Sequence, residues 1–142
     1  MAMMDNDELV EKALYVATEL AKLLLTKHST ILPFALTLDA QGDDVKTYFP
    51  RDKMPDAGWE ELIDAAAGHL KQCIRSTDVG VMALGTELVS GEQAGLGVQI
   101  ETRSTSVFIV YPYTGKGRSQ QLGKPEAAEG LLVEPLLARD AR

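Results

Sequence analysis

LGVQIETRSTSVFIVYPY, residues 96–113, is the stretch of this sequence that decides the fold. Its first half alternates in polarity, which is typical of a β-strand with one buried and one exposed face. The expected buried face carries Val98, Ile100 and Thr102, and the expected exposed face carries Gln99, Glu101 and Arg103. The polar residues 103–105 follow and predict a turn, so this stretch is expected to form a β-hairpin.

The second arm of the hairpin, VFIVY at residues 107–111, is apolar throughout. A strand that is apolar on both faces usually lies inside a sheet, where neighbouring elements cover it. Pro112 has no backbone N–H and should weaken or end the pairing. We therefore expect residues 107–111 to form the central, buried strand of the protein.

Two amphipathic helices are predicted, at residues 5–27 and 59–74. Both repeat apolar residues at the three- and four-residue spacing that places them on one helix face. Asp5 and Glu8 have the spacing of a capping box, and Asp56 is the expected cap of the second helix. The polar face of the first helix carries charges of both signs, which favours packing on the protein's own sheet over membrane binding.

Three more strands complete the predicted sheet. Residues 34–38 and 45–49 are expected to pair around a polar turn, and residues 79–89 form another strand. The predicted fold is α+β, in the order α-β-β-α-β-β-β plus a C-terminal segment. It has a five-stranded, mostly antiparallel sheet with both amphipathic helices on one face.

The composition changes after residue 113, where the chain becomes polar and rich in glycine. Pro125 and Pro135 argue against one long helix there. We expect residues 1–142 to form a single domain in which residues 114–142 are an irregular C-terminal segment.

The totals restrict the classes of function. The chain has 142 residues, 45% of them hydrophobic, and a formal net charge of −7. An acidic balance argues against nucleic-acid or anionic-membrane binding, because both draw affinity from clustered Lys and Arg. The only cysteine, Cys73, excludes an internal disulfide, and the acidic N-terminus does not resemble a secretory signal. No apolar run approaches the roughly 20 residues of a membrane span, so we expect a cytoplasmic protein of bacterial style.

Candidate chemistry is sparse. His69 and Cys73 have helical spacing that suits a metal, but zinc needs at least three protein donors, and Cys73 lies on the apolar face. Asp39, Asp43 and Asp44 lack the calcium-loop pattern and are expected to form a solvated turn. We therefore expect no catalytic residue, no metal site and no cofactor.

The most suggestive polar segment is TGKGRS, residues 114–119. Its two glycines free the backbone, and its two cations are suited to a phosphate or a carboxylate. It lacks the P-loop pattern, and an ordinary turn is the alternative interpretation. The predicted site for an anionic ligand consists of Tyr111, Tyr113, Lys116 and Arg118.

The order helix, two strands, helix, three strands resembles the roadblock and longin group of small α/β proteins. That resemblance implies a dimer that scaffolds or regulates small GTPases. It is one of element order, and Pro135 interrupts the C-terminal helix usual in roadblock proteins. PFALTLDAQGDDVKTYFP and VQIETRSTSVFIVYPYTGKG are also similar to small bacterial proteins, which implies no activity.

Two functional hypotheses remain, and the first arises from the doubly apolar strand and the lack of a catalytic constellation. The second face of that strand needs a cover, either the apolar patch at residues 131–133 or a second copy of the chain. The first hypothesis is a non-enzymatic, homodimeric interaction or accessory protein with a possible protein partner. The alternative is a small-molecule binding protein or enzyme that takes an anionic ligand at residues 111–118.

Overall fold

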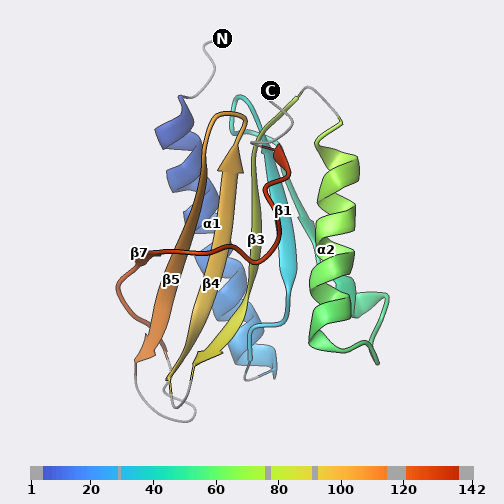
Figure 1. The fold of residues 1–142 in the computed structure, drawn as a ribbon, viewed down its shortest axis with the longest axis vertical. Coiled ribbons are helices and arrows are strands. Elements are labelled where there is room, and N and C mark those ends of the chain that lie inside the picture. The colour runs from blue at the N-terminus through green and yellow to red at the C-terminus, as the bar shows by residue number, and fades with distance from the viewer. Residues whose placement is uncertain (1–4, 29, 76–77, 91–92, 115–120, 138–142) are drawn as a thin grey trace.

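The computed structural model describes residues 5–28, 30–75, 78–90, 93–114 and 121–137. Two helices and an antiparallel sheet form an α+β fold (Figure 1). The elements are α1 (Asn6–His28), β1 (Phe34–Asp39), β2 (Val45–Tyr48), the 3-10 helix η1 (Pro50–Asp52), α2 (Trp59–Cys73), β3 (Val79–Ser90), β4 (Gln93–Thr102), β5 (Ser106–Thr114), β6 (Gln121–Leu122) and β7 (Glu126–Ala128).

The sheet has the order β2-β1-β3-β4-β5-β6, and β7 also pairs with β5. The predicted class and the element order as far as β5 are confirmed, but the sheet has seven strands and not five. The short strands β6 and β7 were missed because two or three residues carry no detectable alternation. The expectation that residues 107–111 lie at the centre is wrong, since β3 and β4 occupy the middle and β5 lies outside them.

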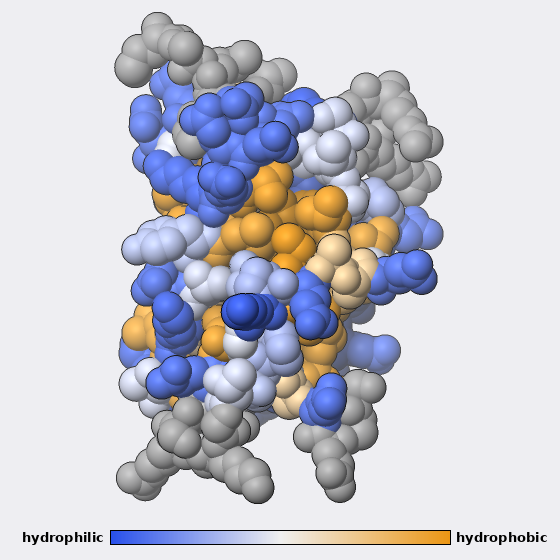
Figure 2. All heavy atoms as spheres, turned by 90° about the vertical axis from the view of Figure 1, so that its left-hand side faces the viewer, coloured by the Kyte–Doolittle hydropathy of each residue, from blue (hydrophilic) through white to orange (hydrophobic). Residues whose placement is uncertain are grey.

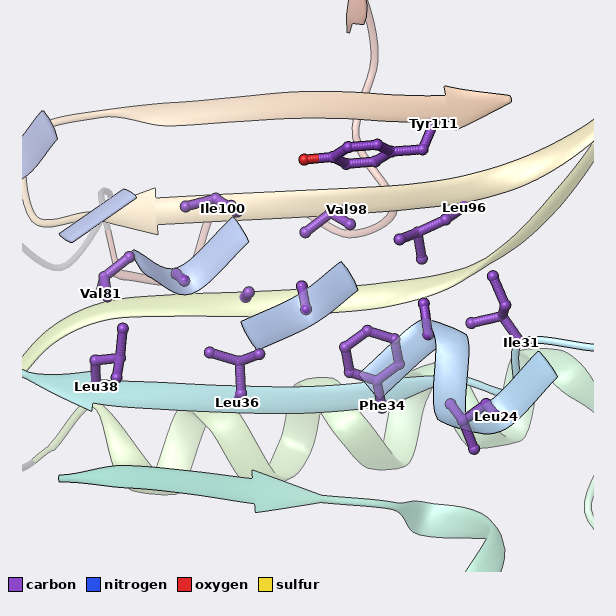
Figure 3. Packing of buried hydrophobic residues seen from close by; sticks show 14 of the residues in the cluster. Leu24, Ile31, Phe34, Leu36, Leu38, Val81, Leu96, Val98, Ile100 and Tyr111 are labelled. Carbon is purple, nitrogen blue, oxygen red and sulfur yellow. The ribbon is translucent and has the colours of Figure 1, made fainter. Parts of the chain in front are cut away.

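One face of the sheet packs against α1. Alternate residues of β1, β3, β4 and β5 point to this face and meet the buried side of the helix (Figure 3). Three alanines on that side keep α1 close to the sheet. The core of this face contains Leu9, Ala13, Ala17, Ala21, Leu24, Ile31, Phe34, Leu36, Leu38, Val81, Ala83, Leu96, Val98, Ile100 and Tyr111.

The other face of the sheet packs against α2, so the expectation that both helices share one face is wrong. Ala35 on β1 and Met82 on β3 point away from α1 and contact Ala66 and Leu70 of α2 in a second core. Both sets of alternate residues on β1 are buried, which gives each helix an apolar surface. The indole nitrogen of Trp59 also donates a 2.7 Å hydrogen bond to the Thr86 hydroxyl of β3.

The predicted caps have different outcomes. Asp5 caps α1 as expected, because its carboxylate accepts a 2.9 Å hydrogen bond from the backbone N–H of Glu8. Asp56 does not cap α2. That helix has the extended Gly58 at its N-cap position, without a side-chain hydrogen bond.

A tail, residues 129–137, packs on the second face of the sheet beside α2. Figure 1 shows the C-terminal chain crossing the sheet on the side opposite α1. Leu132, Val133 and Leu136 pack on the second core and Leu137 is fully buried in it, whereas Leu131 remains 43% exposed. Of the two covers proposed from the sequence, the C-terminal chain therefore occupies this face.

The tail is bound by two buried polar side chains of β4, Gln99 and Glu101. The Gln99 carbonyl oxygen accepts hydrogen bonds from the N–H groups of Leu132 (2.9 Å) and Val133 (3.1 Å). Its amide nitrogen donates to the Val133 carbonyl (3.1 Å) and to Glu101 (2.8 Å), and Glu101 accepts from the N–H of Leu136 (2.8 Å). Both side chains are 0% exposed, so the expectation that they face solvent is wrong.

No helix in the described part of the chain is long and apolar enough to cross a membrane.

Candidate functional site

The structure describes two of the four residues of the predicted anion site. Tyr111 and Tyr113 lie on the α1 side of β5, whereas Lys116 and Arg118 fall outside the described residues. Tyr111 is buried in the core, and burial raises the pKa of its hydroxyl. The predicted ligand role of these four residues stays a prediction.

The hydroxyl of Tyr113 belongs to an internal hydrogen-bonded group. It donates a 2.6 Å bond to one carboxylate oxygen of Glu87, and the Thr30 hydroxyl donates a 2.8 Å bond to the other. Burial and the bond to Glu87 raise the pKa of Tyr113 well above its usual range. This group ties β5 and β3 to the connection between α1 and β1, so its geometry is that of a structural bridge.

His69 and Cys73 do meet on α2, as their spacing predicts. Their Nε2 and Sγ atoms lie 3.5 Å apart. The imidazole stacks on Tyr48 with 4.0 Å between ring centroids, and burial, together with Lys53, lowers the pKa of His69. Among the described residues no group of three or more His, Cys, Asp or Glu side chains is placed to hold a metal. The arrangement fixes α2 on β2 and offers no built metal site.

The aspartates between β1 and β2 form a turn. The Asp39 carboxylate accepts hydrogen bonds from the N–H groups of Asp43 (2.8 Å) and Asp44 (3.1 Å). These bonds lower the pKa of Asp39, and the bond from Asp44 contributes most to this shift. Gly42 supplies the positive φ of 75° that the turn requires. The carboxylate is thus engaged with its own backbone.

A different feature of β5 reaches the protein surface. We call it the β5 surface and define it by Val107 and Ile109 of β5 and Val10 and Leu14 of α1. Val107 is 40% exposed, and the other three side chains are only partly buried against the α1-side core. These residues are branched or long aliphatics, so the exposed area is apolar.

Two contacts orient α1 so that Val10 and Leu14 lie toward β5. The Asn6 side chain donates a 2.7 Å hydrogen bond to the hydroxyl of Ser104, which sets the start of α1 beside the β4–β5 turn. The Lys12 amine binds the carbonyl of Gly42 in the β1–β2 turn, at the other side of the sheet. Val10 and Leu14 are each two positions from Lys12. They therefore lie about 200° around the helix axis from Lys12 and face β5.

The outer edge of β5 is only partly paired. β7 pairs with residues 108–110 and β6 with residues 113–114. Within the described chain, Val107 has no partner on that edge. Figure 2 views this side of the molecule and shows apolar side chains gathered between polar ones above and below. Natural sheet edges usually carry charges or a cover, whereas the unpaired end of this edge carries the apolar Val107.

Reasoning from the sequence noticed the doubly apolar run of β5 but placed it in the interior. One available signal was the width of the apolar stripe on α1. Val10 and Leu14 extend that stripe past the buried positions Ala13 and Ala17, further than one sheet face needs.

Comparison of this chain with protein-family models, with curated proteins and with solved structures finds no match. Its function is therefore inferred from its own residues.

Proposed function

We propose that this protein is a non-enzymatic interaction module that forms a homodimer through the β5 surface. The observation that carries the proposal is the 40% exposure of Val107 on an incompletely paired outer strand. Beside it, Ile109, Val10 and Leu14 keep part of their apolar area in water. Burying such area is the main favourable contribution to protein association.

A second copy suits this surface for a geometric reason. A two-fold dimer places the same patch against itself, so an apolar patch meets an apolar partner without any further requirement. The tail already packs on the second core of the sheet with Leu132, Val133 and Leu136. The β5 surface then offers a partner apolar area from both β5 and α1.

The first prediction is that Val107→Lys dissociates the dimer. Each copy would bring one lysine to the interface, so two ammonium groups would lose water and repel each other across the two-fold axis. We expect the dimer dissociation constant to rise at least about 100-fold, since burying unpaired charge costs several kcal/mol. Native mass spectrometry and light scattering across a dilution series measure this dissociation constant.

The matched control is Val45→Lys. Val45 has the same 40% exposure and lies on β2, at the opposite edge of the sheet. It should leave the dimer intact. A wild-type protein that stays monomeric at every concentration, or equal dissociation of both variants, contradicts the proposal.

A further inference from the structure

A cavity of about 300 Å³ lies between the last turns of α1, the start of β1 and η1. It lies far from β5 in the sheet order, so its role is independent of the proposed dimer. Its walls are apolar and its mouth is polar. The apolar lining residues are Leu23, Leu24, Leu32, Pro33, Phe49 and Pro55, and the polar ones are Lys27, His28, Arg51 and Asp52.

Part of the apolar wall is buried and does not need to form on binding, whereas Leu23 is 47% exposed. Leu24 and Leu32 are 7% and 4% exposed. Figure 3 shows Leu24 and Ile31 at one end of the α1-side core, beyond Phe34. The ring of Phe49 contacts that of Phe34 with centroids 6.5 Å apart. A preformed apolar pocket favours binding because little conformational entropy is lost.

The polar mouth is built by two separate elements. Lys27 and His28 belong to the last turn of α1. Across the cavity, the buried Pro50 begins η1, and backbone bonds from the N–H of Asp52 to Phe49 (3.1 Å) and of Lys53 to Pro50 (3.1 Å) fix this short helix. Arg51 of η1 and Lys27 of α1 therefore line the same cavity.

The charge of the mouth differs from that of the chain. The protein as a whole has a net charge of −7, yet Lys27, Arg51 and His28 face only one carboxylate, Asp52. Cations at the end of a helix are common because they offset the helix dipole, which accounts for Lys27 and His28. It does not account for Arg51, and neither Arg51 nor Lys27 forms a salt bridge within the described chain.

We propose that this cavity binds a small amphipathic carboxylate. The aliphatic or aromatic body of the ligand lies against Leu24, Leu32 and Phe49, and its carboxylate lies at the mouth with Arg51 and Lys27. Arginine presents a planar pair of donors that matches a carboxylate, and the lysine adds a second charge. The cavity volume is at the lower end of ligand pockets, which favours a short chain or a single ring.

The test compares three probes of the same length, namely octanoate, octan-1-ol and octylammonium, by isothermal titration and by two-dimensional NMR of the full chain. We expect octanoate to bind with a dissociation constant of about 1 mM or tighter, and at least about tenfold more tightly than either other probe. Its NMR shift changes should centre on Leu24, Leu32 and Phe49. Equal affinity for octanoate and octylammonium, shift changes centred elsewhere, or no binding each overturn the proposal.

Arg51→Gln tests the role of the mouth. Arg51 is exposed, so the variant should fold normally while it loses about tenfold in octanoate affinity and keeps its affinity for octan-1-ol. Arg75→Gln, at an exposed arginine just after α2, is the matched control and should bind octanoate like the wild type. An unchanged octanoate affinity in Arg51→Gln, or the same loss in Arg75→Gln, overturns the assignment of the carboxylate to Arg51.

Discussion

Replacing Glu101 with alanine is expected to lower the free energy of unfolding by about 3 kcal/mol and to release the tail from the sheet. The Glu101 side chain is 0% exposed and accepts hydrogen bonds from the Gln99 amide and from the backbone N–H of Leu136, both at 2.8 Å. Alanine would leave the N–H of Leu136 and one of the two N–H groups of the Gln99 amide without their partner in the interior, while the other amide N–H keeps its bond to Val133. Each unsatisfied buried donor costs about 1–3 kcal/mol.

Release of the tail would distinguish the loss of these hydrogen bonds from a simple loss of packing. In urea denaturation the variant should show the lower stability, and in hydrogen exchange the amides of Leu132, Val133 and Leu136 should exchange faster than in the wild type. Glu126→Ala is the control, because Glu126 lies exposed on β7 and its loss should change stability by less than about 0.5 kcal/mol. Unchanged exchange at these three amides in Glu101→Ala would contradict the role given to this carboxylate.

The same two residues show where reasoning from the sequence fails. Gln99 and Glu101 alternate with Val98 and Ile100, and alternation predicts an exposed polar face. Their burial depends on the tail, more than 30 positions later in the chain, whose backbone supplies the partners. A hydrogen bond from a side chain to a distant backbone leaves no periodic signal in either segment, so local pattern could not reveal it.

The order of the strands in the sheet could not be predicted from the sequence for a related reason. Both helices and the strands β1 to β5 were predictable because each carries a local pattern, which is a 3.6-residue repeat, a two-residue alternation or a continuous apolar run. The neighbours of β5 are β4, β6 and β7, and the two short strands come after a segment of glycines and charges. Apolar residues on both faces of β5 were therefore interpreted as a central strand. The apolar edge at Val107 became visible only once the order of the sheet was known.

The assignment of both helices to one face failed because β1 is short and buried on both sides. Phe34, Leu36 and Leu38 point to α1, while Ala35 and Thr37 point to the other face. Alanine and threonine are too small to predict a second apolar surface from the sequence, yet small residues allow α2 to pack closely on the sheet. Of the predicted site, Tyr111 and Tyr113 were correctly placed on β5, but the direction of their side chains toward the core depends on the same sheet order.

Gly95→Ala is expected to lower the free energy of unfolding by about 3 kcal/mol or more. Gly95 on β4 lies opposite Pro112 on β5. A β-carbon at this position would lie 2.5 Å from the carbonyl oxygen of Tyr111 and 2.9 Å from the Cα of Pro112. Both contacts are with backbone, so a rotamer change cannot relieve them, and the two strands would have to separate. Thermal and urea unfolding measure the loss.

Gly68→Ala is the matched control and should raise the free energy of unfolding. Gly68 lies within α2, and a β-carbon there would have no atom within 4 Å. Alanine should therefore stabilise the protein by up to about 1 kcal/mol, because it favours the helix and restricts the unfolded chain. The comparison isolates the close approach of β4 and β5 from the general effect of replacing glycine. If Gly95→Ala unfolds like the wild type, these strands pair in another register, and the position of Val107 on the β5 surface would change with it.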